Sequence, residues 1–219
     1  MKIGVISEGP ADRAVVSNIL SGFNGIDISD IIAIRPADKY DETDKSALNP
    51  MNFSNWSLVR EECKSRELIN EFLLLEGQDF IVIHIDTAEA DQYGITRPNK
   101  GLNSYCEDLR NLVIAQINNW LGQDMSEVIL YAVAIEETDA WVLTIYDDKD
   151  SSKSADPKRK LNFVLNGKKI NSTSNYDNFL SISEALSKPK MLKKEKYLDR
   201  NGSLKAFYDE IELKVVPKL

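Results

Sequence analysis

Residues 4–16 of the chain read GVISEGPADRAVV, and they place a carboxylate between a strand and a helix. The apolar run KIGVI at 2–6 is typical of a buried strand, and Pro10 suits the first turn of the helix that follows. Glu8 comes directly after the strand, and Asp12 follows it about one helical turn later. A buried strand that ends in a turn needs no acid at its end. A site that holds a metal ion or polarises water does need one.

The same alternation of strand and helix continues along the chain. Further buried strands are predicted at 31–35, 80–86 and 127–137, helices at 57–75, 102–122 and 138–146, and a long polar loop at 36–55. The run FIVIHID at 80–86 is interrupted by His84, and such apolar runs are typical of central parallel strands covered on both faces. We therefore expect a doubly wound α/β fold whose mostly parallel sheet carries helices on both faces.

The C-terminal third has a less regular pattern. The hydrophilic stretch DDKDSSKSADPKRK at 147–160 predicts a mobile loop. The run NFVLNGKKI at 162–170 predicts a hairpin that turns at Asn166-Gly167. Lysine-rich helices are expected after it, and SLKAFYDEIEL at 203–213 predicts a final helix.

Charge divides the chain into two regions. The net charge is −8, but residues 1–148 hold 11 Lys and Arg against 26 Asp and Glu, whereas residues 149–219 hold 16 against 9. An acidic body with a basic C-terminal third can hold cations at one place and phosphates at another, so nucleic acid is a candidate partner. Two solvated surfaces of different composition would give the same charges. We expect a core domain at 1–146 and, at 147–219, a basic loop and helical extension packed on it.

Several other kinds of protein and site are excluded by the sequence. Cys63 and Cys106 lie far apart with no metal-type spacing, and a single histidine argues against a zinc site. The chain has no GxxxxGK[ST] phosphate loop, no GxGxxG after the first strand and no GxSxG elbow. The first apolar run is too short for a signal peptide, and none approaches the ~20 residues of a membrane span. We expect a cytoplasmic protein with reduced thiols and no membrane contact.

Acids follow three of the predicted strands. Glu8 follows the first, Asp86 ends the third, and Glu136 comes at the end of the fourth, next to Glu137. Because ligands sit at the carboxyl ends of parallel strands, these side chains are expected to face one solvent-accessible pocket. The other acids near it are Asp12, Glu89, Asp91 and Asp139. Clustered carboxylates raise one another's pKa, and a divalent cation removes that penalty; oxygen ligands of this kind suit Mg²⁺ or Mn²⁺.

Some of these positions also have an ordinary structural explanation. Asp12 and Asp139 are each typical of helix caps and helix-dipole partners, and Asp91 is typical of a solvated loop. For His84, a hydrogen-bonded core histidine is a simpler interpretation than a metal ligand. The acids that directly follow buried strands are harder to explain in this way.

Three segments together resemble the Toprim domain. ISEGPADRAVVSNIL at 6–20 looks like its first motif, and FIVIHIDTAEAD at 80–91 looks like its second. AIEETDAWVL at 134–143 is similar to the Glu-x-Trp-Leu stretch of small stand-alone Toprim-like proteins from bacterial defence loci, which are related to overcoming-lysogeny-defect nucleases. The resemblance covers 1–146. It implies a Toprim-like fold and a nuclease that uses Mg²⁺ or Mn²⁺ to hydrolyse phosphodiester bonds of DNA or RNA in antiphage defence.

The resemblance also implies roles for individual residues. Glu8 would bind the ion and serve as a candidate general acid or base, and Asp86 would be the second catalytic acid. The full set of metal ligands would be Glu8, Asp12, Asp86, Glu89, Glu136 and Asp139. Basic segments at 158–160 and 188–200 would grip the nucleic-acid backbone. The phosphate contacts would be Lys190, Lys193, Lys194 and Arg200, although lysines there are equally typical of a solvated helix face.

One position departs from the pattern of the family. The second motif is usually Asp-x-Asp, whereas this chain has Asp86-Thr87-Ala88. Either Glu89 or Asp91 replaces the missing acid, or one metal is lost. The departure leaves an alternative function open, that of a catalytically weak Toprim-like interaction subunit that regulates a partner ATPase or toxin.

Overall fold

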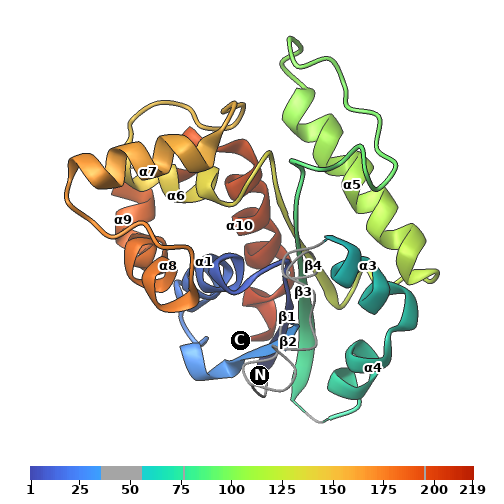
Figure 1. The fold of residues 1–219 in the computed structure, drawn as a ribbon. Helices are drawn as coiled ribbons and strands as arrows, with labels where there is room; N and C mark the ends of the chain where they lie inside the picture. Colours follow the sequence, from blue (N-terminus) through green and yellow to red (C-terminus); the bar gives the residue numbers. More distant parts are fainter. Residues whose placement is uncertain (36–55, 76, 195) are drawn as a thin grey trace, which may run out of the picture.

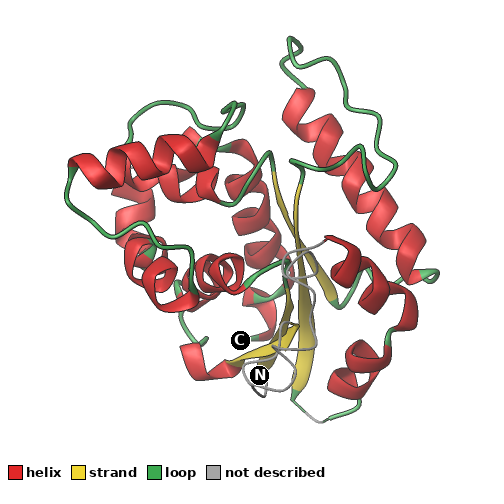
Figure 2. Ribbon diagram, viewed as in Figure 1, coloured by secondary structure: helices red, strands yellow, loops and turns green. Residues whose placement is uncertain are grey.

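The computed structural model describes residues 1–35, 56–75, 77–194 and 196–219 (Figure 1). At its centre lies a four-stranded sheet with the order β2-β1-β3-β4, in which each neighbouring pair is parallel. The strands are β1 (Lys2–Ile6), β2 (Ile31–Arg35), β3 (Gln78–Asp86) and β4 (Ile129–Ala134). Helices lie on both sides of the strands (Figure 2), which confirms the predicted α/β fold with a parallel sheet.

Two groups of helices cover the two faces of the sheet (Figure 1). One face carries α3 (Trp56–Ser65), α4 (Glu67–Leu73) and α5 (Tyr105–Leu121). The other carries α1 (Pro10–Ser21), α6 (Asp139–Tyr146), α7 (Pro157–Gly167), α8 (Tyr176–Ile182), α9 (Pro189–Lys194) and α10 (Gly202–Lys214). Short 3-10 helices lie at Ile28–Asp30 (η1), Glu184–Ser187 (η3), Tyr197–Arg200 (η4) and Val216–Lys218 (η5).

Strand β3 separates two apolar cores by the alternation of its side chains. Its isoleucines pack with residues of α3, α4 and α5, whereas Phe80 and Val82 join a core that also contains residues of α1, α7 and α10. His84 and Asp86 continue the series of Phe80 and Val82, so their side chains lie on that second face. The imidazole Nε2 of His84 is 3.5 Å from Oδ1 of Asp86, as expected for residues two apart on a strand.

The predicted helix at 57–75 is wrong in one respect, because it is divided into α3 and α4 at Arg66. The φ angle of Arg66 is 56°, which lies in the left-handed region. The buried carboxylate of Glu62 accepts hydrogen bonds from the backbone N–H groups of Leu68 (3.0 Å) and Ile69 (3.2 Å). These bonds satisfy donors at the start of α4 that no helical carbonyl can reach, so they stabilise the break.

The predicted hairpin at 162–170 is also wrong, because residues 162–167 belong to helix α7. Asp156 caps the N-terminus of α7 through its side chain, and Pro157 occupies the first turn. Leu161 and Leu165, one helical turn apart, are both buried. An apolar stripe and a capped start therefore decide the structure of this segment.

The segment 147–160, predicted as a mobile loop, is shorter than expected and is tied to the body of the protein. Its last four residues belong to α7. The buried hydroxyl of Ser151 donates to the carbonyl of Ala140 at 2.7 Å. The backbone N–H of Ser151 donates to the carbonyl of Arg200 at 2.8 Å.

The other predicted elements agree with the structure within a few residues, with two exceptions. The strand predicted at 127–137 ends earlier, at Ala134. The loop predicted at 36–55 lies outside the described residues. No helix within the described ranges combines the length and the apolar character needed to cross a membrane.

Candidate functional site

Acids from three segments of the chain line one pocket at the carboxyl ends of β1 and β3 and at the start of α6. The pocket has a volume of about 530 Å³. Of the predicted ligands, it contains Glu8, Asp12, Asp86, Glu89 and Asp139, and it also contains Glu137. We call it the acid pocket. Lys158, at the start of α7, also lines it.

Glu8 and Asp86 are linked directly by a hydrogen bond. The backbone N–H of Asp86 donates to Oε1 of Glu8 at 2.7 Å, and the backbone of Trp56 also hydrogen-bonds to the Glu8 carboxylate. Only 8% of Glu8 is exposed. The end of β3 therefore fixes the position of an acid that follows β1, as expected for neighbouring parallel strands.

A second chain of hydrogen bonds fixes the carboxylate of Asp86. Its Oδ1 accepts from both the backbone N–H of Thr138 (3.0 Å) and the hydroxyl of Thr138 (2.9 Å). The same hydroxyl lies 2.7 Å from Nε2 of His84. Since the hydroxyl hydrogen is directed to Asp86, we assign the imidazole hydrogen to Nε2, from which it is donated to Thr138.

His84 is therefore a hydrogen-bonded core residue, as the sequence indicated. It is fully buried, and burial lowers its pKa, so the imidazole is neutral. Its Nδ1 has no hydrogen-bond partner among the described residues, which fits an unprotonated nitrogen better than a buried N–H group. The imidazole orients Thr138, and Thr138 orients Asp86.

The acid pocket raises the pKa of three carboxyl groups. Burial, with the nearby charge of Asp12, raises the pKa of Glu8 to about 8. Burial and the charges of Asp12 and Glu8 raise the pKa of Asp86 well above its ordinary value. Burial and the charge of Glu137 raise the pKa of Asp139 to about 7. The acid pocket thus favours bound protons or a bound cation over free carboxylates.

The donor atoms in the acid pocket fit a divalent cation. Three possible ligand atoms lie within 4.8 Å of one another, one each from Asp12, His84 and Asp86. Carboxylate oxygens suit Mg²⁺ and Mn²⁺, and these ions would offset the burial and the repulsion that raise the carboxyl pKa values. Since the Nε2 of His84 is used by Thr138, the carboxylates are the better candidates for direct contact with an ion.

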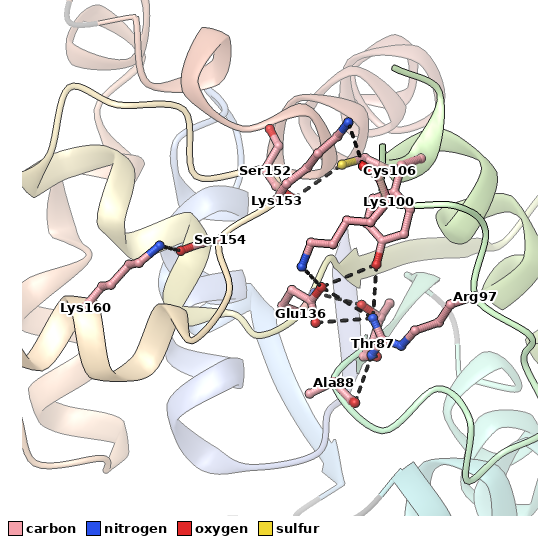
Figure 3. A network of polar contacts seen from close by, with 11 residues as sticks. Thr87, Ala88, Arg97, Lys100, Cys106, Glu136, Ser152, Lys153, Ser154 and Lys160 are labelled. Atoms are coloured by element: carbon pink, nitrogen blue, oxygen red, sulfur yellow. Dashed lines mark hydrogen bonds and ion pairs between the residues drawn. The ribbon is translucent and has the colours of Figure 1, made fainter. Parts of the chain in front are cut away.

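Glu136 lies outside the acid pocket, so the expectation that it faces Glu8 and Asp86 is wrong. Its φ angle is 66°, which turns the chain at the end of β4. Its carboxylate instead accepts from Lys100 Nζ at 2.9 Å and Arg97 Nη1 at 3.3 Å (Figure 3). The next residue, Glu137, lines the acid pocket in its place.

Arg97 also holds the chain that follows β3. Its Nη2 donates to the carbonyls of Thr87 and Ala88, the latter at 2.9 Å (Figure 3). This is the segment where the resemblance to the Toprim domain predicted a second acid and the chain has Ala88. Glu89 follows it and lines the acid pocket, whereas Asp91 is exposed and does not line it. Of the two candidate replacements, Glu89 is the one that the fold brings to Asp86.

The predicted phosphate contacts in the C-terminal third have different surroundings. Arg200 is engaged in the fold: it donates to the carbonyl of Thr144 at 2.6 Å and pairs with Asp148 at 2.6 Å. Lys190 is exposed on α9. The side chains of Lys193 and Lys194 lie outside the described part of the chain. Lys158, in the predicted basic segment 158–160, does line the acid pocket.

Comparison of the chain with protein-family models, with curated proteins and with solved structures finds no match. The resemblance to Toprim-like proteins stays a prediction from the three motifs. The functional argument below therefore starts from the acid pocket and its hydrogen bonds.

Replacing Thr138 by Val is expected to weaken Mn²⁺ binding about tenfold or more, because Asp86 loses the hydroxyl that orients it. The free energy of unfolding should fall by about 1–3 kcal/mol, since His84 keeps a buried N–H without an acceptor. Calorimetric titration with Mn²⁺ and urea unfolding measure the two effects. Thr138→Ser keeps the hydroxyl and should restore most of the affinity; equal losses in both variants would contradict the orienting role.

Proposed function

We propose that this protein is a Toprim-like nuclease that uses Mg²⁺ or Mn²⁺ to hydrolyse phosphodiester bonds of DNA or RNA, with a role in antiphage defence. The observation that carries the proposal is the acid pocket itself. Five acids that the sequence singled out, from segments far apart in the chain, line one cavity at the carboxyl ends of parallel strands. The raised pKa values of its carboxyl groups support a cationic ligand there.

The residues of the acid pocket would have different roles in hydrolysis. Glu8, Asp12, Asp86 and Glu89 would hold the ion, and Asp139 would complete or orient a second position. When bound, the ion activates water and stabilises charge on the phosphate oxygens. Thr138 holds Asp86 in one orientation. Lys158 offers a positive charge to the phosphate at the rim of the pocket.

A cleavage panel tests the proposal. Supercoiled plasmid, linear duplex, single-stranded DNA and single-stranded RNA would each be incubated with the protein in Mg²⁺, Mn²⁺ or EDTA. We expect cleavage of at least one substrate with metal and none in EDTA. Glu8→Gln protein purified in the same way controls for contaminating nucleases. Absence of cleavage on all four substrates, together with no heat of Mn²⁺ binding, would overturn the proposal.

One observation favours the second candidate, a catalytically weak interaction subunit that regulates a partner ATPase or toxin. Ala88 stands where the second motif usually has an acid, and Arg97 binds the carbonyl of this residue. A subunit that had lost catalysis would have no need of the missing acid. Absence of Mg²⁺ or Mn²⁺ binding at millimolar concentration would favour this candidate over the nuclease.

A further inference from the structure

Phe163 on α7 is 80% exposed, yet it forms one wall of a cavity. The cavity lies between α6, α7 and the segment that joins them, and its volume is about 580 Å³, within the range of ligand sites. Leu143 and Val164 add apolar surface to it. We call it the Phe163 pocket. A single exposed phenyl ring needs no explanation, but one that walls a cavity of this size offers a flat apolar face to a ligand.

Cations line the same pocket as the aromatic ring. Lys149, Arg159 and Lys160 line the Phe163 pocket. Arg159 precedes Phe163 by four residues, so both lie on one face of α7. The Arg159 side chain is 82% exposed and pairs with Asp156 only at the surface, where such a pair contributes little. Lys160 donates to the neutral hydroxyl of Ser154 (Figure 3), and this contact leaves its charge uncompensated.

Two acids also line the Phe163 pocket, and both are engaged with the backbone. Asp147 accepts from the backbone N–H of Lys149 at 3.1 Å, and Asp150 accepts from that of Ser152 at 2.8 Å. These short-range bonds stabilise the turns of the joining segment. The lining carries three cations against two acids, an excess of one positive charge, which favours a ligand with negative charge.

The Phe163 pocket and the acid pocket are neighbours, because residues of α6 and of α7 line both of them. On α6, Asp139 lines the acid pocket and Leu143, one turn later, lines the Phe163 pocket. Four residues of helix span about 6 Å. On α7, Lys158 lines the acid pocket and its neighbour Arg159 lines the Phe163 pocket. A ligand strand that places one phosphate in the acid pocket can therefore extend into the Phe163 pocket over a short distance.

We propose that the Phe163 pocket receives an unpaired base of single-stranded nucleic acid, which stacks on Phe163 while Arg159 and Lys160 contact neighbouring phosphates. Aromatic platforms interleaved with cations bind single strands in this way, because every base has a π-face. A base inside a duplex is paired and stacked, and presenting its face would cost unstacking energy. The inference rests on the proposed function, since it names the substrate class of the acid pocket.

Binding measured without metal tests the inference. Fluorescence anisotropy in EDTA would compare a labelled 12-nucleotide oligothymidine, an oligouridine and a duplex of equal length. We expect Phe163→Ala to raise the Kd for the single strands about tenfold, in line with the loss of one stacked base, and to change that for the duplex less than twofold. Phe163→Trp should retain the affinity. Leu213→Ala removes another exposed apolar side chain, on α10, and should have no effect.

The outcomes separate this inference from the proposed function. Phe163-dependent binding of single strands, with neither cleavage of the four substrates nor heat of Mn²⁺ binding, would keep the inference and overturn the nuclease. Unchanged single-strand affinity in Phe163→Ala, or an equal loss on the duplex, would overturn the inference, whatever the cleavage panel gives. Equal binding losses in Phe163→Ala and Leu213→Ala would also overturn it, since they would show a non-specific apolar effect.

Discussion

Replacing Glu8 by Gln is expected to reduce metal-dependent cleavage about a thousandfold or more in a protein that stays folded. Gln has the shape of Glu, and its Oε1 can still accept the hydrogen bond from the backbone N–H of Asp86. Only the negative charge is lost, and that charge is what the ion requires. Initial cleavage rates at saturating Mg²⁺ or Mn²⁺, on the best substrate of the panel, measure the effect.

Asp91→Asn is the matched control for this variant. Asp91 lies on the same loop as Glu89, but it is exposed and does not line the acid pocket. The same chemical change should therefore leave the cleavage rate within about twofold, as for an ordinary surface substitution. Cleavage by Glu8→Gln at the wild-type rate would rule out the acid pocket as the active site.

The meeting of Glu8 and Asp86 could be predicted from the sequence for a physical reason. Each acid follows an apolar run, and parallel strands end at the same edge of a sheet. Asp12 could be added because one helical turn brings it back toward Glu8. Strand ends and helix turns are short-range features, and a sequence pattern records them directly.

The sequence could not show in the same way that Glu137, and not Glu136, lines the acid pocket. This arrangement depends on the left-handed φ of Glu136 and on Arg97 and Lys100, which reach Glu136 from a distant loop. The role of Thr138 was missed for a similar reason. Its hydroxyl reaches Asp86 only because β3 and β4 pair with Asp86 opposite Ala134.

The error at α7 had a signal in the sequence. Asn166-Gly167 is typical of a hairpin turn, but glycine is equally typical of a helix end. The pair Asp156-Pro157 has the pattern of a capped helix start, and Leu161 recurs at helical spacing before Leu165. A cap and an apolar stripe together outweigh a two-residue turn signal. That weighting would also have placed Phe163 on a helix beside a cation run.

Without metal, Glu8→Gln is expected to be more stable than the wild-type protein at pH 8, by about 4 kcal/mol. The pKa of Glu8 is raised from 4.5 to about 8 in the folded protein. Below pH 4.5 the carboxyl is protonated in both the folded and the unfolded state, so it carries no penalty there. As the pH rises from 4.5 to 8, the unfolded chain releases a proton that the folded protein retains, and the free energy of unfolding falls.

Urea unfolding in EDTA at pH 4.5, 6 and 8 measures this effect as the difference between variant and wild type. The difference should be near zero at pH 4.5 and should grow with pH. Saturating Mn²⁺ should reverse the order at pH 8, because an ion that binds only the folded wild-type site stabilises it, whereas Glu8→Gln gains little. A variant less stable than wild type at pH 8 in EDTA would contradict the raised pKa. The stability difference between the two proteins could also grow with pH in EDTA and yet keep its sign in Mn²⁺. The acid pocket would then bind protons but no metal, as expected for the interaction subunit.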